Sequence, residues 1–323
     1  MKRQLLGVAA ILLSISTYAQ DNPLWMRYCA ISPDGTTIAF TYKGDIYTVP
    51  STGGRASQIT TNPAHDTKPI WSPDGKKIAF ASDRMGSMDI FEVNKEGGIP
   101  KRLTTHSGNE TPVAYKDAGH ILFLANIMPT AEDAQFPSGQ FQQVYEVNTE
   151  GGRPILFSSM PMEDISINHT GNTLLYHDKK GYEDPWRKHH TSSITRDIWL
   201  CSLNGNRTFR KQTAFNGEDR TPVWASDDKS FYYLSEEKGS FNIFKRDIDG
   251  NTSKQITNHT KHPVRFLSAA SNGTLCYGYD GEIYTVKEGA IPQKVQISIV
   301  TDKNDKDLIR QIKRSGATEI SLS

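Results

Sequence analysis

The stretch WSPDGKKIAFASDR, residues 71–84, places a tight-turn sequence between two short apolar segments. Proline in such a turn fixes its own φ, an aspartate side chain bonds to nearby backbone, and glycine accepts conformations that other residues avoid. In this copy the three residues are Pro73, Asp74 and Gly75. The segments that flank such turns along the chain are rich in Ile, Val, Phe, Tyr and Thr. This pattern predicts short antiparallel strands joined by a hairpin.

The turn recurs, so that the chain carries six copies of one unit. Similar sequences are ISPDGTTIAF, at residues 31–40, and WASDDKSFYYLS, at residues 224–235. The six turn positions, at intervals of 40, 43, 53, 57 and 45 residues, are Gly35, Gly75, Ala118, Gly171, Asp228 and Gly273. A period in this range indicates a repeat architecture.

Each repeat has the same plan of four short strands. In the second repeat the hairpin is followed by an alternating segment, MDIFEV at 88–93, then by a Gly-Gly turn and a closing segment, PKRLT at 100–104. One four-stranded sheet cannot bury both of its faces, whereas radial packing of neighbouring sheets can. We therefore predict an all-β fold, a six-bladed β-propeller of four-stranded antiparallel blades over residues 24–299. A large β-sandwich is the alternative, but it gives no reason for turns at this spacing.

Two expectations concern how the blades meet. Because each blade is contiguous in the sequence, we expect no strand borrowed from the other end of the chain, and ring closure by side-chain packing between the first and sixth blades. Trp71 and Trp224 lie next to the repeated turn on the innermost strand. We expect both to pack between blades rather than to form a platform for a ligand.

Two intervals between turns are long, because residues 126–142 and 178–196 are inserted between the second and third strands of blades three and four. Long loops in a compact repeat are often functional. We expect these loops on the face from which the chain enters each innermost strand. Trp186 and Arg187 in the second insert are candidate contacts for a partner, since both residue types are enriched at interface hot spots. The adjacent His189 and His190 predict a solvated basic loop rather than a metal site.

A polar cluster precedes each innermost strand and is expected to form a ring at the channel mouth. Examples are Glu163 with Asp164, and Thr260 to His262. Such a ring could hold a peptide by its termini, with carboxylates for the amine and Lys68, Arg220 or Arg265 for the carboxylate. The candidate peptide- or partner-binding residues here are Asp66, Lys68, Glu110, Asp219, Arg220 and Arg265. The alternative is that the aspartates satisfy backbone donors where the chain bends into a strand.

The N-terminus has the parts of a secretory signal peptide. Lys2 and Arg3 precede an apolar stretch of roughly 11 residues and a small residue, Ala19, at a plausible cleavage point. We expect residues 1–19 to be removed and the protein to be exported, to the periplasm, with no membrane span left after cleavage. A membrane anchor is the alternative for this segment, and a cytoplasmic location follows if it is not processed.

The rest of the sequence argues against several kinds of chemistry. It has no nucleophile elbow, no HExxH, no Walker A and no GxGxxG. Its net charge of +1 gives no support to nucleic-acid binding. Cys29, Cys201 and Cys276 are far apart in the sequence and odd in number, which favours buried free thiols over a disulfide framework. We predict no catalytic residue, no metal and no cofactor.

The repeat WSPDGKKIAFASDR, followed by an I-[FY] strand, Gly-Gly and [QR]-[IL]-T, resembles the WD40-like PD40 repeat of TolB and of the propellers of tricorn-type peptidases. The insert EDPWRKHHTSSITRDIW resembles the fourth-blade insertion of bacterial tricorn homologues, and residues 316–323 look like the start of another repeat. The resemblance implies a non-catalytic six-bladed propeller of a longer serine peptidase. Residues 300–323 would then be a linker and a truncated repeat before further propeller and peptidase domains.

That resemblance implies a role in peptide access or binding, with peptides or proteins as partners over the channel face. No catalytic residue of the family matches this sequence. One alternative is a stand-alone TolB-like periplasmic module that docks other proteins. Another is the propeller half of a prolyl-oligopeptidase-like enzyme.

Overall fold

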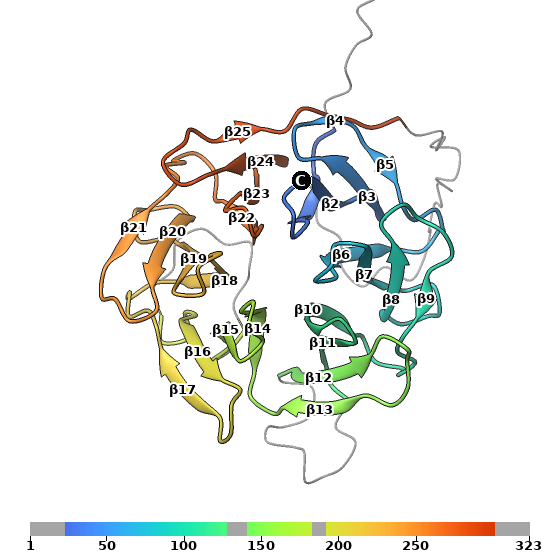
Figure 1. The fold of residues 1–323 in the computed structure, drawn as a ribbon, viewed down its shortest axis with the longest axis horizontal. Coiled ribbons are helices and arrows are strands. Elements are labelled where there is room, and N and C mark those ends of the chain that lie inside the picture. The colour runs from blue at the N-terminus through green and yellow to red at the C-terminus, as the bar shows by residue number, and fades with distance from the viewer. Residues whose placement is uncertain (1–22, 128–140, 183–191, 301–323) are drawn as a thin grey trace, which may run out of the picture.

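The computed structural model describes residues 23–127, 141–182 and 192–300, and these form a β-propeller (Figure 1). Six sheets of four antiparallel strands are arranged radially around a central axis, and a two-stranded sheet lies at the rim. The described residues contain no helix, and therefore none that could cross a membrane. The predicted fold class is confirmed.

The strands of each blade follow one another outward from the axis. Blades one to three comprise β1 (Arg27–Ile31), β2 (Thr37–Tyr42), β3 (Asp45–Pro50) and β5 (Ser57–Gln58); β6 (Asp66–Trp71), β7 (Lys77–Ser82), β8 (Asp89–Asn94) and β9 (Lys101–Arg102); and β10 (Thr111–Asp117), β11 (His120–Ala125), β12 (Gln143–Asn148) and β13 (Ile155–Ser158). Blades four to six comprise β14 (Met162–Ile167), β15 (Thr173–Asp178), β16 (Ile198–Ser202) and β17 (Thr208–Lys211); β18 (Asp219–Trp224), β19 (Ser230–Ser235), β20 (Asn242–Asp247) and β21 (Ser253–Gln255); and β22 (Arg265–Ala269), β23 (Leu275–Tyr279), β24 (Glu282–Val286) and β25 (Gln293–Lys294).

The repeated turn works as its sequence predicts. In blade two, the Asp74 carboxylate accepts hydrogen bonds from the Ser72 hydroxyl at 2.7 Å and from the Lys76 amide at 3.1 Å. Gly75 has φ +67°, in the left-handed region that glycine tolerates, and its amide donates to the Ser72 carbonyl at 2.9 Å. Blade three differs, because its strands are joined through Ala118 and Gly119 alone.

The innermost strands share an irregularity that determines what faces the channel. Each has a register shift against its neighbour near its third residue, which is a β-bulge. In five blades one residue at this bulge has a positive φ of 48° to 57°. These residues are Tyr28, Lys68, Asp164, Thr221 and Phe266. In blade three the position is Pro112, whose ring does not permit a positive φ.

Large apolar side chains fill the spaces between blades. Six clusters of buried residues are present, and each joins strands of adjacent blades. The Trp71 indole donates to the Ala30 carbonyl of blade one at 2.8 Å, and the Trp224 indole donates to the Ser166 carbonyl of blade four at 3.0 Å. Both tryptophans therefore bridge neighbouring blades, as expected from the sequence.

Ring closure uses backbone pairing as well as side chains, so the expectation of side-chain packing alone is wrong. β26 (Ile297–Ser298) leaves blade six and pairs in parallel with β4 (Gly54–Arg55), which precedes the outermost strand of blade one (Figure 1). The Gly54 amide donates to the Gln296 carbonyl at 2.8 Å, and the Ala56 amide donates to the Ser298 carbonyl at 2.9 Å. Sequence reasoning missed this pair because two residues carry no detectable strand pattern.

The pairing of β26 with β4 predicts that an alanine is tolerated less well at one glycine of the rim than at another. Gly53 and Gly97 both have φ +94°, but a Cβ on Gly53 would lie 2.7 Å from the Gln296 carbonyl oxygen, whereas one on Gly97 would lie 3.6 Å from the Ile59 carbonyl oxygen. Both alanine variants carry the same backbone strain. We expect Gly53→Ala to lower the free energy of unfolding by about 1 to 3 kcal/mol more than Gly97→Ala, since only the first disrupts closure. Urea denaturation measures the difference, and equal losses would contradict this role of the pair.

Candidate functional site

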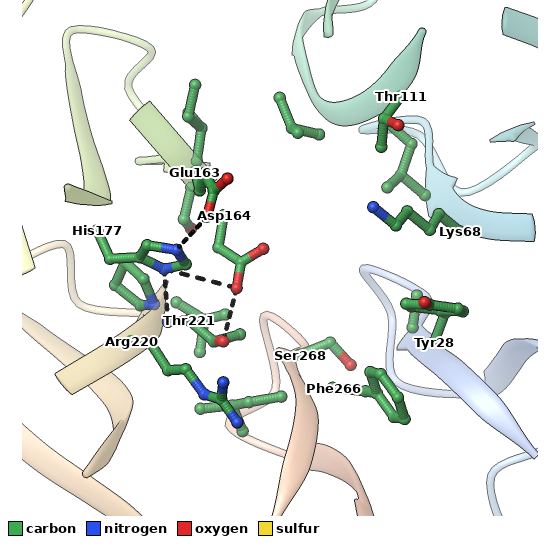
Figure 2. A pocket seen from close by; sticks show the side chains of 18 of the residues that line it. Tyr28, Lys68, Thr111, Glu163, Asp164, His177, Arg220, Thr221, Phe266 and Ser268 are labelled. Atoms are coloured by element: carbon green, nitrogen blue, oxygen red, sulfur yellow. Dashed lines mark hydrogen bonds and ion pairs between the residues drawn. The ribbon is translucent and has the colours of Figure 1, made fainter. Parts of the chain in front are cut away.

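The innermost strands surround a cavity of about 520 Å³ at the face from which they begin. All six blades contribute to its lining, through Tyr28, Lys68, Thr111, Asp164, Thr221 and Phe266 among others (Figure 2). These residues come from the first three positions of their strands, at or next to the bulge. The cavity is therefore the mouth of the central channel.

One wall of the cavity is a hydrogen-bonded network between blades four and five (Figure 2). His177, from β15, is buried, and its Nε2 lies 3.2 Å from Glu163 Oε2. The Thr221 amide donates to Nδ1 at 3.3 Å, and the Thr221 hydroxyl donates to Asp164 Oδ2 at 2.6 Å. Nδ1 is thus the acceptor and Nε2 carries the proton that is donated to Glu163. Both ring nitrogens are engaged in holding the wall together.

The two carboxylates of this wall differ in how far they are neutralised. Glu163 also contacts Lys179 at 2.7 Å and Arg196 at 3.6 Å. Burial acts to raise the pKa of Glu163, but the hydrogen bond from His177 and the Lys179 ammonium hold that pKa well below its ordinary value. Asp164 has a side chain that is 47% exposed. It is the carboxylate of this wall that a ligand in the channel can reach.

The opposite wall is aromatic and basic. The rings of Tyr28 and Phe266 pack with centroids 4.8 Å apart across the seam between blades one and six. The Lys68 ammonium lies 5.8 Å from the centre of the Tyr28 ring. Burial raises the pKa of the Tyr28 phenol, so the hydroxyl stays protonated near neutral pH and can donate a hydrogen bond. This wall offers an apolar surface with a cation beside it.

Arg220 and Arg265 also line the cavity. The Arg220 guanidinium lies 4.1 Å from the centre of the Phe241 ring and 3.4 Å from Glu218 Oε1. Burial lowers the pKa of Arg220 to about 10, so the group remains charged at neutral pH. Of the six candidate binding residues in and before the innermost strands, the structure therefore places Lys68, Arg220 and Arg265 in the cavity lining.

The three acidic candidates, Asp66, Glu110 and Asp219, do not line the cavity, which corrects their expected position at the channel mouth. Asp66 and Asp219 are the first residues of the innermost strands in blades two and five, Glu110 directly precedes the one in blade three, and all three are buried. In a regular strand a residue and the one two places later point the same way, but the bulge breaks this alternation, so the earlier residue is buried between blades while the bulge residue lines the cavity. Asp66 there accepts two hydrogen bonds of 2.9 Å from Arg84. A side chain, rather than backbone donors, satisfies it.

Glu110 and Asp219 form no ion pair with a cation among the described residues, although the charge of Arg102 acts on Glu110 from farther away. The Thr104 hydroxyl accepts from the Ile90 amide at 2.9 Å and donates to one Glu110 oxygen. Asp219 is hydrogen-bonded to the Ser235 and Thr213 hydroxyls. One oxygen of each carboxyl has no hydrogen-bond partner among the described residues. Burial is the main cause that raises the pKa of each group to about 7.

These two carboxyl groups predict an unusual dependence of stability on pH. Their pKa values are about 7 in the folded chain, against ordinary values of 4.5 for Glu110 and 3.8 for Asp219. A raised pKa gives stability that is complete below the ordinary value and is lost as the pH rises through the folded value. We expect unfolding free energy to fall between pH 4.5 and 7 by an amount of about 3 kcal/mol for each group.

The double variant Glu110→Gln and Asp219→Asn should flatten this dependence in urea denaturation across that pH range. Asp66→Asn is the matched control, because it removes the carboxyl of the same strand position that Arg84 neutralises. That control should lower stability without removing the slope. A wild-type chain whose stability rises from pH 4.5 to 7 would contradict the assignment.

Sequence reasoning found part of this site and missed part. Glu163 and Asp164 were recognised as a polar cluster, but no local signal separates the carboxylate that is neutralised from the one that is exposed. His177 lies on the second strand of its blade, and nothing in its neighbours indicates a contact with Thr221 of the next blade.

Trp186 and Arg187 lie outside the described residues, as do residues 1–19 and 301–323. Within the described chain, no group of three or more His, Cys, Asp or Glu is arranged to hold a metal ion.

The six-bladed ring with its polar channel mouth defines a propeller of the class shared by TolB and tricorn proteins. Residues 23–290 match the family model of the tricorn protease N-terminal beta propeller domain, and the chain belongs to that family. Tricorn protease homolog 1 of Streptomyces coelicolor is 25% identical over 281 residues, which cover 86% of this chain and 25% of that protein. The chain thus spans about a quarter of the length of this relative.

Solved structures agree on the fold. The crystal structure of the tricorn protease aligns with a TM-score of 0.72 at 20% identity, over 88% of this chain and 27% of that chain. The structure of TolB from Acinetobacter baumannii aligns with a TM-score of 0.59 at 14% identity, over 81% of this chain and 61% of that chain. At these identities the likeness establishes the architecture alone.

Proposed function

We propose that this chain is the non-catalytic propeller of an exported tricorn-like serine peptidase, and that its channel mouth binds peptides during their access to the peptidase. The observation that carries the proposal is the mixed character of the cavity. Asp164 on one wall and Lys68 on the other lie at equivalent bulge positions of different blades, with the Tyr28 and Phe266 rings beside Lys68.

The chemistry of a short peptide matches this arrangement. A free peptide has an ammonium group at one end, a carboxylate at the other and apolar side chains between. Asp164 can accept from the ammonium, and Lys68 can donate to the carboxylate, in charge-assisted hydrogen bonds. Tyr28 and Phe266 provide an apolar surface for a side chain. Both charged residues are held by the propeller ring, so a ligand would meet a preorganised site.

The same cavity supports a binding role rather than a catalytic one. His177 is the imidazole nearest to the carboxylates of the wall, and both of its nitrogens are occupied, by Glu163 and by the Thr221 amide. It therefore has no free nitrogen with which to activate a hydroxyl. Ser166 and Ser268 line the cavity, but Ser268 is bound within the seam between blades six and one. We expect no peptide hydrolysis by this chain alone.

Peptides with blocked ends test the two polar contacts separately. Asp164→Asn should weaken the binding of a peptide with a free amine by about 3- to 10-fold, and should leave its N-acetylated form unchanged. Lys68→Ala should do the same for a free carboxylate relative to the C-terminal amide. Fluorescence anisotropy of labelled pentapeptides on the whole chain gives the dissociation constants.

Lys76→Ala is the control for loss of a lysine, because Lys76 lies in the hairpin turn at the opposite end of β6 and pairs only with Asp74 among the residues that the structure describes. It should leave peptide binding unchanged. If acetylation and amidation alter binding equally in wild type and in both channel variants, the channel does not recognise peptide termini in this way. Binding that is absent for every peptide would remove the proposal.

A stand-alone TolB-like interaction module, exported in the same way, is the second candidate, and the TolB-like architecture favours it. An antibody against this propeller distinguishes the two in fractionated source cells. We expect a periplasmic polypeptide about four times as long as this chain, from the share of the Streptomyces relative that it covers. A periplasmic band near 36.1 kDa would favour the separate module. A cytoplasmic band would contradict export.

A further inference from the structure

The seam between blade one and blade six brings together two cysteines that are distant in the sequence. Cys29 lies on β1, the innermost strand of blade one, and Cys276 lies on β23, the second strand of blade six. Both belong to the same buried cluster, with exposed fractions of 4% and 0%. The third cysteine, Cys201, is buried in a different cluster, within blade four.

Hydrogen bonds from one serine fix the two cysteines beside each other. Ser268 is the register partner of Cys276. Its hydroxyl lies 3.4 Å from the Cys276 carbonyl oxygen and 3.5 Å from the Cys29 carbonyl oxygen. The same hydroxyl accepts from the Ile31 amide at 3.0 Å. The backbones of β1 and blade six are therefore joined at the level of the two cysteines.

The side chains meet within that framework. The Cys29 thiol lies 3.4 Å from the Phe266 carbonyl oxygen of β22, so it points from blade one into blade six. Burial is the main cause that raises the pKa of the Cys276 thiol, and the neighbouring Cys29 side chain adds to that rise. All three cysteines are free thiols in this structure. Two free thiols in one buried cluster at the closing seam are candidates for a disulfide, which needs Cα atoms about 4.4 to 6.8 Å apart.

We propose that Cys29 and Cys276 form a disulfide that closes the propeller ring covalently when the chain folds in the presence of a disulfide donor. The thiolate of one cysteine attacks a sulfur of a low-molecular-weight disulfide, which releases one small thiol and leaves a mixed disulfide. The second thiolate then displaces the other small thiol. Two protein thiols are oxidised by two electrons in total, and the small disulfide is reduced to two thiols.

The position of this bond gives it a larger effect than an arbitrary cross-link. It joins the first blade to the last, so the closed loop includes nearly the whole propeller, and long loops remove the most entropy from the unfolded chain. Apart from it, backbone closure at the rim depends on the short pair of β4 and β26. Burial of both sulfurs also shields the bond from reductants once the ring has closed.

The test is a count of thiols in the whole chain. Reduced, unfolded protein is refolded in a mixture of reduced and oxidised glutathione or in dithiothreitol, then alkylated under denaturing conditions and weighed. We expect one alkylated cysteine, Cys201, after glutathione and three after dithiothreitol. Peptide mapping should identify a linked pair of peptides that contain Cys29 and Cys276. Protein secreted to the periplasm of an expression host gives the same readout without refolding.

Cysteine variants provide the controls. Cys201→Ala should keep the link and show no alkylated cysteine, whereas Cys29→Ala should show two and no linked peptide. The oxidised wild type should melt at least about 5 °C above the reduced form, a difference that Cys29→Ala abolishes. Three alkylated cysteines in the oxidised wild type, a link to Cys201, or equal melting temperatures with the link present would overturn the proposal.

Discussion

The β-bulge near the start of each innermost strand is the constraint on which the channel depends. A regular strand would send alternate side chains between blades and toward the axis, but the bulge changes that alternation after the second residue. In five blades it is accompanied by a positive φ at a residue other than glycine, a conformation that costs free energy and persists only where the surroundings enforce it. Five of the residues that line the channel mouth carry this strain.

The bulge also separates the carboxyl groups that are buried between blades from the charged residues that face the channel. Two places before it, carboxyl groups are buried between blades, where Arg84 neutralises Asp66 while Glu110 and Asp219 form no ion pair among the described residues. Residues at it enter the channel, where Asp164 and Lys68 stay within reach of a ligand. Inter-blade carboxyl groups thus affect stability, whereas channel charges are available for recognition. The two sets are adjacent in sequence and separate in space.

Closure of the ring is a second constraint, because a propeller has a first and a last blade that no covalent connection joins. In this chain, contacts between blades one and six close the ring at three distances from the axis. At the axis, aromatic rings of Tyr28 and Phe266 pack across the seam. Farther out, Ser268 links β1 to blade six beside the two thiols. At the rim, β26 pairs with β4. Side chains alone, as the sequence suggested, account for part of this closure.

The sequence by itself determined the number of blades, the hairpin positions and the long insertions of blades three and four. These features follow from local chemistry, because turn residues fix their own dihedral angles and the composition of five or six residues is enough to indicate a strand. Tertiary structure alone decided which polar residues face the channel and which cysteines meet. Neighbouring residues on a strand point in opposite directions, so a bulge of one residue changes their roles, and contacts across the closing seam join positions more than two hundred residues apart. No local pattern encodes either result.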